Sequence, residues 1–234
     1  MDYLEEYEGK LGISLTAEQL ERFARYQALL LEWNQRINLT AAKSAQEIQV
    51  RHFVDSLTCM LATGDLNGRS LIDIGSGAGF PGLPLKIVNP HMELVLVESV
   101  EKKGGFLKEV VQELNLAKVS VVMDRAEVIG HKPEHRQRYD WAVARAVAPL
   151  SPLLEYLLPL CRVGGHALAQ KGARAEEELL SSREAIEILG GKVVDQIPVP
   201  LTGEADAKLI VIEKLRDTPR KFPRRVGIPM KRPL

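Results

Sequence analysis

The feature that most constrains the fold of this chain is a glycine-rich stretch between two short apolar runs. Residues 71–82 read Leu-Ile-Asp-Ile-Gly-Ser-Gly-Ala-Gly-Phe-Pro-Gly, and the second apolar run ends in Glu98. A strand, a glycine turn, a helix and a second strand ending in an acid form the nucleotide-binding unit of parallel sheets. Gly75 permits the sharp turn, and Gly77 and Gly79 are expected to let a ligand approach the backbone. The acid is placed to accept hydrogen bonds from a ribose.

The spacing of the glycines distinguishes two classes of cofactor. A dinucleotide fingerprint has glycine at its first, third and sixth positions, but the sixth position here is Phe80. The pattern is instead Gly-x-Gly-x-Gly, preceded two residues earlier by Asp73. This form resembles motif I of S-adenosylmethionine-dependent methyltransferases, whose cofactor has no pyrophosphate. We therefore favour a methyltransferase over a nicotinamide-dependent dehydrogenase, and we expect Phe80 to pack on the cofactor rather than in the core.

Strands alternate with helices along the central part of the chain. The apolar runs predict strands at 69–74, 93–98, 119–123, 139–144 and 165–170, followed by an antiparallel pair at 192–197 and 208–213. This order predicts a doubly wound, mostly parallel α/β sheet of the Rossmann-like class I methyltransferase type. We expect one domain, with a helical extension at 1–66, a core at 67–215 and a tail at 216–234.

Two capping boxes predict the helices of the extension. Thr16 with Gln19 opens the first helix, which should run to about Arg36, and Ser44 with Glu47 opens the second. The second helix should turn Ile48, Phe53, Val54, Leu57 and Leu61 inward. Its polar stripe pairs Arg51 with Asp55 and His52 with Ser56 at i,i+4. The stripe is either solvated surface or a polar rim over the mouth of the cofactor site.

Ligands on such sheets lie at the carboxyl ends of the strands, near the point where the strand order reverses. The residues that follow the predicted strands are therefore the candidates for the site: Asp73 to Phe80, Glu98, Ser99, Ala126, Glu127, Arg145 and Lys171. Each basic residue also has a simpler interpretation, because Arg145 and Lys171 could pair a carboxylate at the sheet edge or hold RNA phosphates. His52 could be a partly buried histidine satisfied by backbone.

The charge distribution points to an anionic partner. Basic and acidic residues balance at 31 each, but the tail at 216–234 holds seven basic residues and one acid. Its prolines should keep it extended. We expect this arm to contact RNA phosphates, so that truncation after Glu213 weakens RNA binding and leaves cofactor binding nearly intact. A merely solubilising tail is the alternative.

Other classes of protein are disfavoured by composition. Cys59 and Cys161 are too few and too scattered for a disulfide framework or a zinc site, so we expect no metal. The sequence shows no signal peptide and no long apolar span. We expect a cytoplasmic monomer without a membrane partner.

Motifs that the sequence lacks disfavour several kinds of methyl acceptor. Enzymes acting on exocyclic amines carry an Asn/Asp-Pro-Pro-aromatic turn after the fourth strand, where this chain reads Ala-Arg-Ala-Val-Ala-Pro at 144–149. Cys161 lies at an apolar helix end and suits a buried hydrophobic role better than that of a nucleophile on cytosine C5. The Lys-Asp-Lys-Glu set of ribose methyltransferases is not recognisable. An acceptor that needs no deprotonation remains, and guanine N7 is one.

The sequence resembles one family over nearly its whole length, the bacterial 16S ribosomal RNA N7-guanine methyltransferases, also called glucose-inhibited division protein B. The matching residues are Trp33-Asn34, Asn38-Leu39-Thr40, Arg51-His52 with Asp55-Ser56, residues 73–82, Glu98-Ser99 with Lys102-Lys103, Arg125-Ala126-Glu127, Arg145-Ala146, Lys171-Gly172 and the Pro-Arg-Arg sequence from Pro223. Val226 departs from the family pattern, in which a proline is expected. The resemblance implies methylation of a guanine in the decoding-region loop of the small ribosomal subunit.

The resemblance and the strand positions together give the expected site. S-adenosylmethionine should contact Asp73, Gly75, Gly77, Gly79, Phe80, Glu98, Ser99, Ala126, Glu127 and Arg145. We expect Arg145, Lys171 and His52 at the reacting centre. The residues expected on 16S ribosomal RNA, or on an assembling small subunit, are Arg51, Lys171, Arg220, Lys221, Arg224, Arg225, Lys231 and Arg232. The rival interpretations are a methyltransferase for another RNA or a small molecule, a dehydrogenase, and a non-catalytic RNA-binding module.

Overall fold

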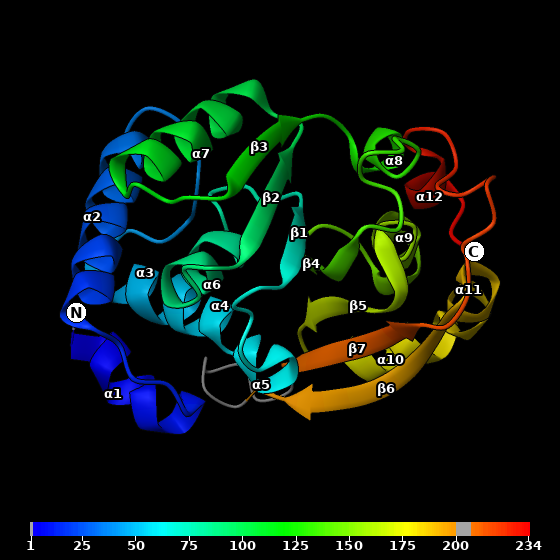
Figure 1. Ribbon diagram of the computed structural model, residues 1–234, viewed down its shortest axis with the longest axis horizontal. Coiled ribbons are helices and arrows are strands. Elements are labelled where there is room, and N and C mark those ends of the chain that lie inside the picture. The colour runs from blue at the N-terminus through cyan, green and yellow to red at the C-terminus, as the bar shows by residue number, and fades with distance from the viewer. Residues whose placement is uncertain (1, 200–206) are drawn as a thin grey trace.

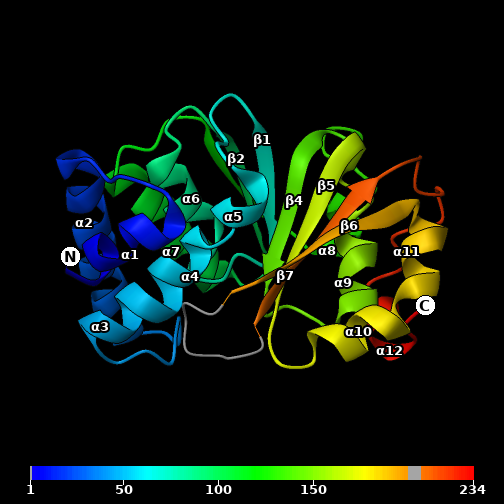
Figure 2. The same cartoon turned by 90° about the horizontal axis from the view of Figure 1, so that it is seen from below.

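A twisted seven-stranded sheet runs through the centre of the molecule between two layers of helices (Figures 1 and 2). The structure, a computed structural model, describes residues 2–199 and 207–234. The described strands are β1 Ser70–Ile74, β2 Glu93–Glu98, β3 Val119–Met123, β4 Tyr139–Arg145, β5 Cys161–Lys171, β6 Gly191–Pro198 and β7 Lys208–Lys214. Their order is β3-β2-β1-β4-β5-β7-β6, with β1 to β5 parallel and β7 antiparallel to both of its neighbours. The predicted doubly wound sheet and its antiparallel end are confirmed.

Alternation along the strands separates two hydrophobic cores. Successive side chains point to opposite faces of a sheet. Leu71 accordingly packs with the helices of the N-terminal half, whereas Ile72 packs with those of the C-terminal half. Leu168 and Ala169 divide in the same way in β5. Buried strands covered on both faces explain why these runs are apolar throughout.

The helices of the first layer come mainly from the N-terminal third. This layer contains α1 Asp2–Leu11, α2 Ala17–Asn34, α3 Ala45–Ile48, the π-helix η1 Gln49–Val54, α4 Asp55–Leu57, α5 Met60–Thr63, α6 Gly82–Val88 and α7 Glu101–Glu113. The capping box at Thr16 is confirmed, because its hydroxyl accepts from Gln19 N and the Gln19 side chain accepts from Thr16 N. Ser44 caps α3 as expected, but the Glu47 carboxylate accepts from Lys43 N instead of closing the second box.

The second layer and the tail cover the other face. Its helices are α8 Ala126–Ile129, α9 Leu150–Leu157, α10 Ala175–Ser181, α11 Arg183–Leu189 and α12 Ile228–Lys231. The tail does not extend freely, because it folds back beside α8 and α9 and ends near α11 (Figure 1). Leu61 was expected to face inward but is 39% exposed. Ser182 separates α10 from α11, and α9 begins at Leu150 after Pro149.

Candidate active site

The carboxyl ends of the parallel strands border two adjacent cavities. The glycine-loop cavity, of about 420 Å³, is lined by Ile74, Gly75, Val97, Ser99, the segment 124–127, Val147, Tyr156, Val226, Gly227 and Met230. The basic cavity, of about 660 Å³, lies beside the ends of β4 and β5 and is lined by residues that include Thr40, Arg51, His52, Asp55, Arg145, Lys171, Arg174, Glu178 and Lys208. Val147 lines both cavities, so a ligand in one can meet a ligand in the other at this residue.

Gly75 brings the glycine loop against the segment that follows β4. Its φ is +67°, in the left-handed region, and a Cβ atom there would lie 2.7 Å from Val147 Cγ2. A side chain would therefore push apart the two segments that meet between the cavities. Gly79 also has positive φ, but a Cβ there would collide with Leu83 and the Tyr26 hydroxyl. The space beside Gly79 is thus taken by side chains of α2 and α6, and contact of its backbone with a ligand stays a prediction.

Glu98 ends β2 beside the glycine loop, as expected, and its carboxylate already receives three backbone hydrogen bonds. Gly77 N donates to Oε2 at 3.0 Å, and Ser99 N and Val100 N donate to Oε1 at 2.7 and 2.8 Å. The residue is 6% exposed. A carboxylate offers about four acceptor positions, so acceptor capacity remains for a ligand. Glu98 therefore also orders the loop that the cofactor is expected to touch.

Asp73 stabilises the glycine loop from its buried side. It is fully buried, and its Oδ2 accepts from Gly82 N at 2.9 Å. Its Oδ1 has no hydrogen-bond partner within the described ranges 2–199 and 207–234. Burial, opposed in part by the bond from Gly82, raises the pKa of Asp73 to about 7. Asp73 lines neither cavity, so the structure gives it a loop-holding position rather than the expected cofactor contact.

Phe80 lies in an aromatic cluster that joins the extension to the glycine loop. Its ring centroid lies 4.7 Å from that of His52 and 5.6 Å from that of Tyr26, and Arg145 Cζ lies 4.9 Å from the Phe80 centroid. The residue is 5% exposed and lines neither cavity. The structure therefore supports the core position that was the alternative for Phe80. Its packing on the cofactor stays a prediction without a geometric basis.

Ala126 and Glu127 line the glycine-loop cavity together with the C-terminal tail. The Glu127 carboxylate accepts from Gly227 N at 2.9 Å. Val226 and Met230, on either side of this bond, line the same cavity. The structure thus brings Gly75, Ser99, Ala126 and Glu127 together as expected. It adds Val226, Gly227 and Met230 of the tail, which had been expected to contact RNA.

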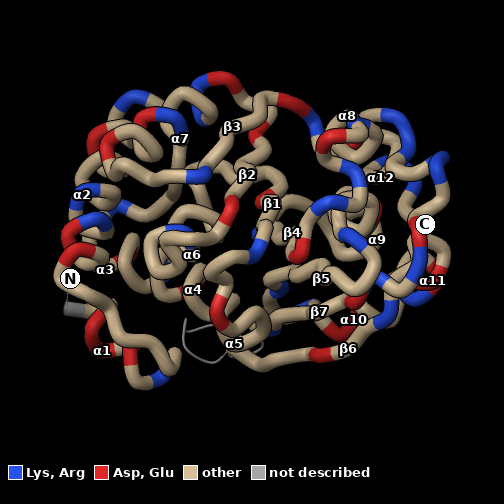
Figure 3. The backbone as a smooth tube through the Cα atoms, in the orientation of Figure 1, with Lys and Arg blue, Asp and Glu red and all other residues tan. Residues whose placement is uncertain are grey.

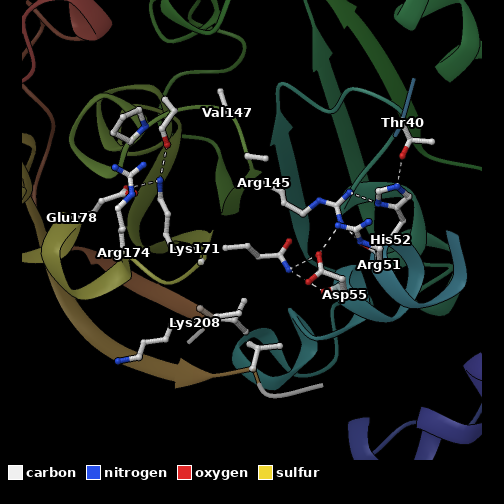
Figure 4. A pocket seen from close by; sticks show the side chains of 18 of the residues that line it. Thr40, Arg51, His52, Asp55, Arg145, Val147, Lys171, Arg174, Glu178 and Lys208 are labelled. Atoms are coloured by element: carbon white, nitrogen blue, oxygen red, sulfur yellow. Dashed lines mark hydrogen bonds and ion pairs between the residues drawn. The ribbon is translucent and has the colours of Figure 1, made fainter. Parts of the chain in front are cut away.

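Arg145 is the central cation of the basic cavity (Figure 4). Its Nη1 donates to Asp55 Oδ2 at 2.7 Å and to Arg51 O at 3.1 Å, and its Nη2 lies 3.2 Å from His52 Nδ1. Three of its five N–H donors are used in this way, which leaves Nε–H and one Nη2–H for a ligand. Arg51 and His52 come from the π-helix η1, and Asp55 is the first residue of α4. Asp55 faces Arg145 instead of pairing with Arg51 as its spacing suggested.

His52 is held in one neutral tautomer. A guanidinium only donates hydrogen bonds, so Nδ1 must be the acceptor beside Arg145. Nε2 then carries the proton and donates to the Thr40 hydroxyl, which also accepts from Ala42 N at 3.1 Å. Burial, and next the positive charge of Arg145, lower the pKa of His52 to about 4. The imidazole has no free lone pair toward the cavity and does not charge near neutral pH.

Lys171 anchors the loop between β4 and α9. Its Nζ donates to Ala148 O at 2.6 Å and pairs with Glu178 Oε2 at 2.8 Å, and its side chain is 9% exposed. The same Glu178 oxygen accepts from Leu150 N at 2.7 Å. Figure 4 places Lys171 across the cavity from Arg145. Lys171 thus borders the acceptor space, but its charge is already neutralised by Glu178.

The expected RNA contacts fall into two groups. Arg51, Arg220, Lys221, Arg225, Lys231 and Arg232 are exposed, and the described part of the chain shows no ion-pair partner for any of them. Arg224 is different, because it forms a bidentate ion pair with the fully buried Glu155, with Nε and Nη2 at 3.0 and 2.7 Å from Oε2. The structure therefore argues against Arg224 as a phosphate contact. Figure 3 shows the remaining basic positions along the tail beside α8 and α12.

Sequence reasoning missed several residues of the site. Val147, Tyr156, Val226, Gly227 and Met230 line the glycine-loop cavity, although none of them carries a motif of its own. One sequence signal could have shown that the tail packs against the core. Glu155 is the sole charged residue of the otherwise apolar helix α9, and a lone acid on a buried helix indicates a hidden cationic partner.

Within residues 2–199 and 207–234, no His, Cys, Asp and Glu side chains cluster in a way that could hold a metal ion. No helix in those ranges is both long and apolar enough to cross a membrane.

Comparison with known proteins gives a consistent picture. A family model described as rRNA small subunit methyltransferase G matches residues 19–205. A protein of Roseiflexus castenholzii named ribosomal RNA small subunit methyltransferase G is 52% identical over 234 residues, covering 100% of both chains. A protein of the same name from Bacillus cytotoxicus is 43% identical and covers 97% of this chain and 95% of its own length.

Solved structures show the same fold at low identity. A SAM-dependent methyltransferase from Aquifex aeolicus superimposes with a TM-score of 0.56 and 16% identity, over 74% of this chain and 94% of its own. A fibrillarin pre-rRNA processing protein from Methanococcus jannaschii gives a TM-score of 0.53 at 16% identity, over 65% and 69%. These likenesses establish a Rossmann-like methyltransferase fold.

Proposed function

The chain belongs to the rRNA small subunit methyltransferase G family, and from this we propose that it transfers a methyl group from S-adenosylmethionine to a guanine N7 in 16S ribosomal RNA. The guanine would lie in the decoding-region loop, as the resemblance implies. The observation that carries the proposal is the pair of cavities that meet at Val147, one beside the glycine loop and one lined by cations. This is the arrangement that a donor and an anionic acceptor require.

The glycine-loop cavity suits S-adenosylmethionine. A volume of about 420 Å³ lies in the range of small-ligand sites. Glu98 does not line the cavity but orders the loop beside it and retains acceptor capacity for ribose hydroxyls. Gly75 lines the cavity in close contact with Val147. The cofactor supplies an activated sulfonium methyl group, so the protein has to orient its partner rather than activate it.

The basic cavity suits a guanine nucleotide. The remaining donors of Arg145 can grip an electronegative edge such as guanine O6 or a neighbouring phosphate, which would align N7 with the methyl group. Positive charge grows on the guanine as N7 is methylated, so a cation aimed at the ring itself would oppose the reaction. The rigid pairing of Arg145 with Asp55 supports a gripping position, because it holds the guanidinium in one orientation.

The methyl transfer we propose needs no general base. Guanine N7 carries a lone pair and no proton, so nothing has to be removed before attack. His52 supports this mechanism, because Nδ1 faces Arg145 and Nε2 faces Thr40. The role we propose for His52 is to position Arg145.

We also propose that the exposed cations carry the ribosomal RNA. They are Arg51 at the rim of the basic cavity and five tail residues, Arg220, Lys221, Arg225, Lys231 and Arg232. Exposed, unpaired cations release counterions on binding and make affinity salt-dependent. A cytoplasmic monomer is the form we expect, which sedimentation of the purified protein at working concentration would test.

Transfer of a tritiated methyl group tests the proposed function. The acceptors are 16S ribosomal RNA, assembled small subunits, an unrelated RNA and free guanine nucleotides. We expect label in the first two alone, and mass mapping should place it on one guanine as a 7-methyl group. Label on a different base or confined to a small molecule would refute the proposal.

A further inference from the structure

The C-terminal tail forms one side of the glycine-loop cavity. We call residues 222–230 the C-terminal wall. Val226, Gly227 and Met230 of this wall line the cavity, and the side chains of Val226 and Met230 are 52% and 48% exposed. Large apolar side chains half exposed beside a cavity lose solvent contact when a ligand fills it, which favours binding.

A buried ion pair holds the wall in position. Glu155 of α9 is fully buried, and its Oε1 accepts a hydrogen bond from Arg224 N at 2.5 Å. The Arg224 side chain adds the bidentate pair to the same carboxylate. Charge-assisted bidentate bonds fix direction as well as distance. The bond from Gly227 N to Glu127 then fastens the wall to α8 on the far side of the cavity.

Arg136 fastens the segment that precedes the wall. Its guanidinium donates to Phe222 O and Thr218 O, both at 2.8 Å, and to Gly130 O at 2.7 Å. Phe222 and Thr218 are buried. The tail is thus built into the cavity on several sides. Truncation after Glu213 would remove this side of the cavity, so we now expect it to weaken cofactor binding as well as RNA binding.

We infer that the C-terminal wall is part of the cofactor site, with Val226 and Met230 packing on the nucleoside end of S-adenosylmethionine and Glu155 and Arg224 as positioning residues. The inference rests on the proposed function, because it places that cofactor in this cavity. The ribose is expected at Glu98, and the base lies beyond it toward the end of β3, where the segment 124–127 faces the wall. The adenine ring is flat and weakly polar, and methionine sulfur packs well on such rings.

Calorimetry with the full-length protein tests the apolar contact. The variant is Val226→Ala with Met230→Ala, and its matched control is Val163→Ala with Leu180→Ala, which also shortens two exposed apolar side chains, at 49% and 59% exposure. Neither control residue lines a described cavity. We expect the wall variant to bind S-adenosylmethionine about tenfold more weakly and the control to match wild type.

A truncated ligand locates the contact on the cofactor. 5′-Methylthioadenosine retains the nucleoside and lacks the amino-acid arm. We expect its affinity to fall by the same factor in the wall variant. A loss for S-adenosylmethionine without a loss for 5′-methylthioadenosine would overturn the nucleoside assignment.

Glu155→Gln tests the positioning residues. The substitution keeps the shape of the side chain but removes the charge that Arg224 needs. We expect weaker cofactor binding in Glu155→Gln and no further loss when it is combined with the wall variant, because both act through the same contact. General destabilisation would instead add to the loss. If Glu155→Gln does not fold, the two exposed wall substitutions still decide the inference.

The outcomes separate the inference from the proposed function. Wild type that fails to bind S-adenosylmethionine would refute the proposed function itself. Wild type that binds, with a wall variant of unchanged affinity, would refute the C-terminal wall alone.

Discussion

The two cavities beside Val147 differ in how their polar groups are used. In the glycine-loop cavity, a backbone N–H group satisfies the carboxylate of Glu127, and the other described lining residues are uncharged apart from Asp124 and Arg125. Among the described residues, the basic cavity is lined by five cations and two carboxylates: Arg51, Arg145, Lys171, Arg174 and Lys208 with Asp55 and Glu178. We therefore expect ligand binding to depend mainly on shape in the glycine-loop cavity and mainly on charge in the basic cavity. Substitutions should separate cofactor affinity from methyl transfer.

The largest effect should come from Arg145→Ala. Loss of the grip on the acceptor should lower methyl transfer under single-turnover conditions by roughly a hundredfold or more, since small misplacements cost that much. The family resemblance implied a contact of Arg145 with S-adenosylmethionine, but Arg145 lines the basic cavity and not the glycine-loop cavity. We therefore expect the affinity of Arg145→Ala for S-adenosylmethionine to stay close to wild type. Calorimetry measures the binding, and circular dichroism checks the fold.

Arg162→Ala is the matched control for Arg145→Ala. Arg162 also pairs with an aspartate, Asp140 at 2.8 Å, but at the beginning of β5 and far from the cavities. Its transfer rate should match wild type. Equal losses in both variants would mean that Arg145 acts through stability alone.

His52→Gln should change how stability depends on pH. The unfolded histidine binds a proton below about pH 6.5, whereas the folded residue stays neutral down to about pH 4, so wild type loses stability as pH falls between these values. The loss should reach roughly 3 kcal/mol at pH 4 and should be absent from the variant. Denaturant melts from pH 7 to 4 measure it, and other groups such as Asp73 cancel in the difference.

The same variant tests the base-free mechanism. The methyl-transfer rate of wild type should show no step near pH 6.5, and His52→Gln should lose less activity than Arg145→Ala. A step in wild type that disappears in His52→Gln would show that the histidine takes a proton during the reaction.

Glu98→Ala should weaken binding of S-adenosylmethionine by roughly 1–3 kcal/mol. The variant loses acceptors for the ribose and also the three backbone bonds that order the glycine loop. Glu101→Ala, an exposed acid in the first turn of α7, is the control and should bind normally. Wild-type affinity in a folded Glu98→Ala protein would exclude Glu98 from the cofactor site.

The smallest effect should come from a single exposed cation of the tail. Arg225→Gln should lower affinity for ribosomal RNA by at most about 1 kcal/mol. The slope of log affinity against log salt should fall by about 0.7 for one lost contact to single-stranded RNA. Lys192→Gln on β6 is the control. An unchanged slope in Arg225→Gln would remove this residue from the RNA surface.

Much of the fold could be predicted because its signals are local. The apolar runs of the strands, the capping box at Thr16 and the glycine loop each depend on neighbours in the chain, and each was found where it was expected. The π-helix η1 could not be predicted, since its hydrogen-bond pattern departs from the ordinary helical period. The position of Asp55 opposite Arg145 depends on that departure.

The candidate site shows a similar division. Residue order alone placed Gly75, Ser99, Ala126 and Arg145 at the carboxyl edge of the sheet, because parallel strands bring their ends together. Residue order did not reveal that Phe80 would pack between Tyr26 and His52. An aromatic side chain can pack on a ligand or in a core equally well. The packing of α2 against the glycine loop, which brings Tyr26 onto Phe80, decides between these two positions.

Residue types and spacing were sufficient for the doubly wound sheet, the residues at its ligand edge and the family of the chain. Tertiary structure alone decided which charges remain available. Lys171 is neutralised by Glu178, Arg224 by Glu155, and Arg145 is aimed by Asp55. Asp55 and Glu155 are distant in sequence from their partners, and Glu178, although near Lys171 in the chain, lies on a different element. The strength of an ion pair depends on distance and burial, which a linear sequence does not contain.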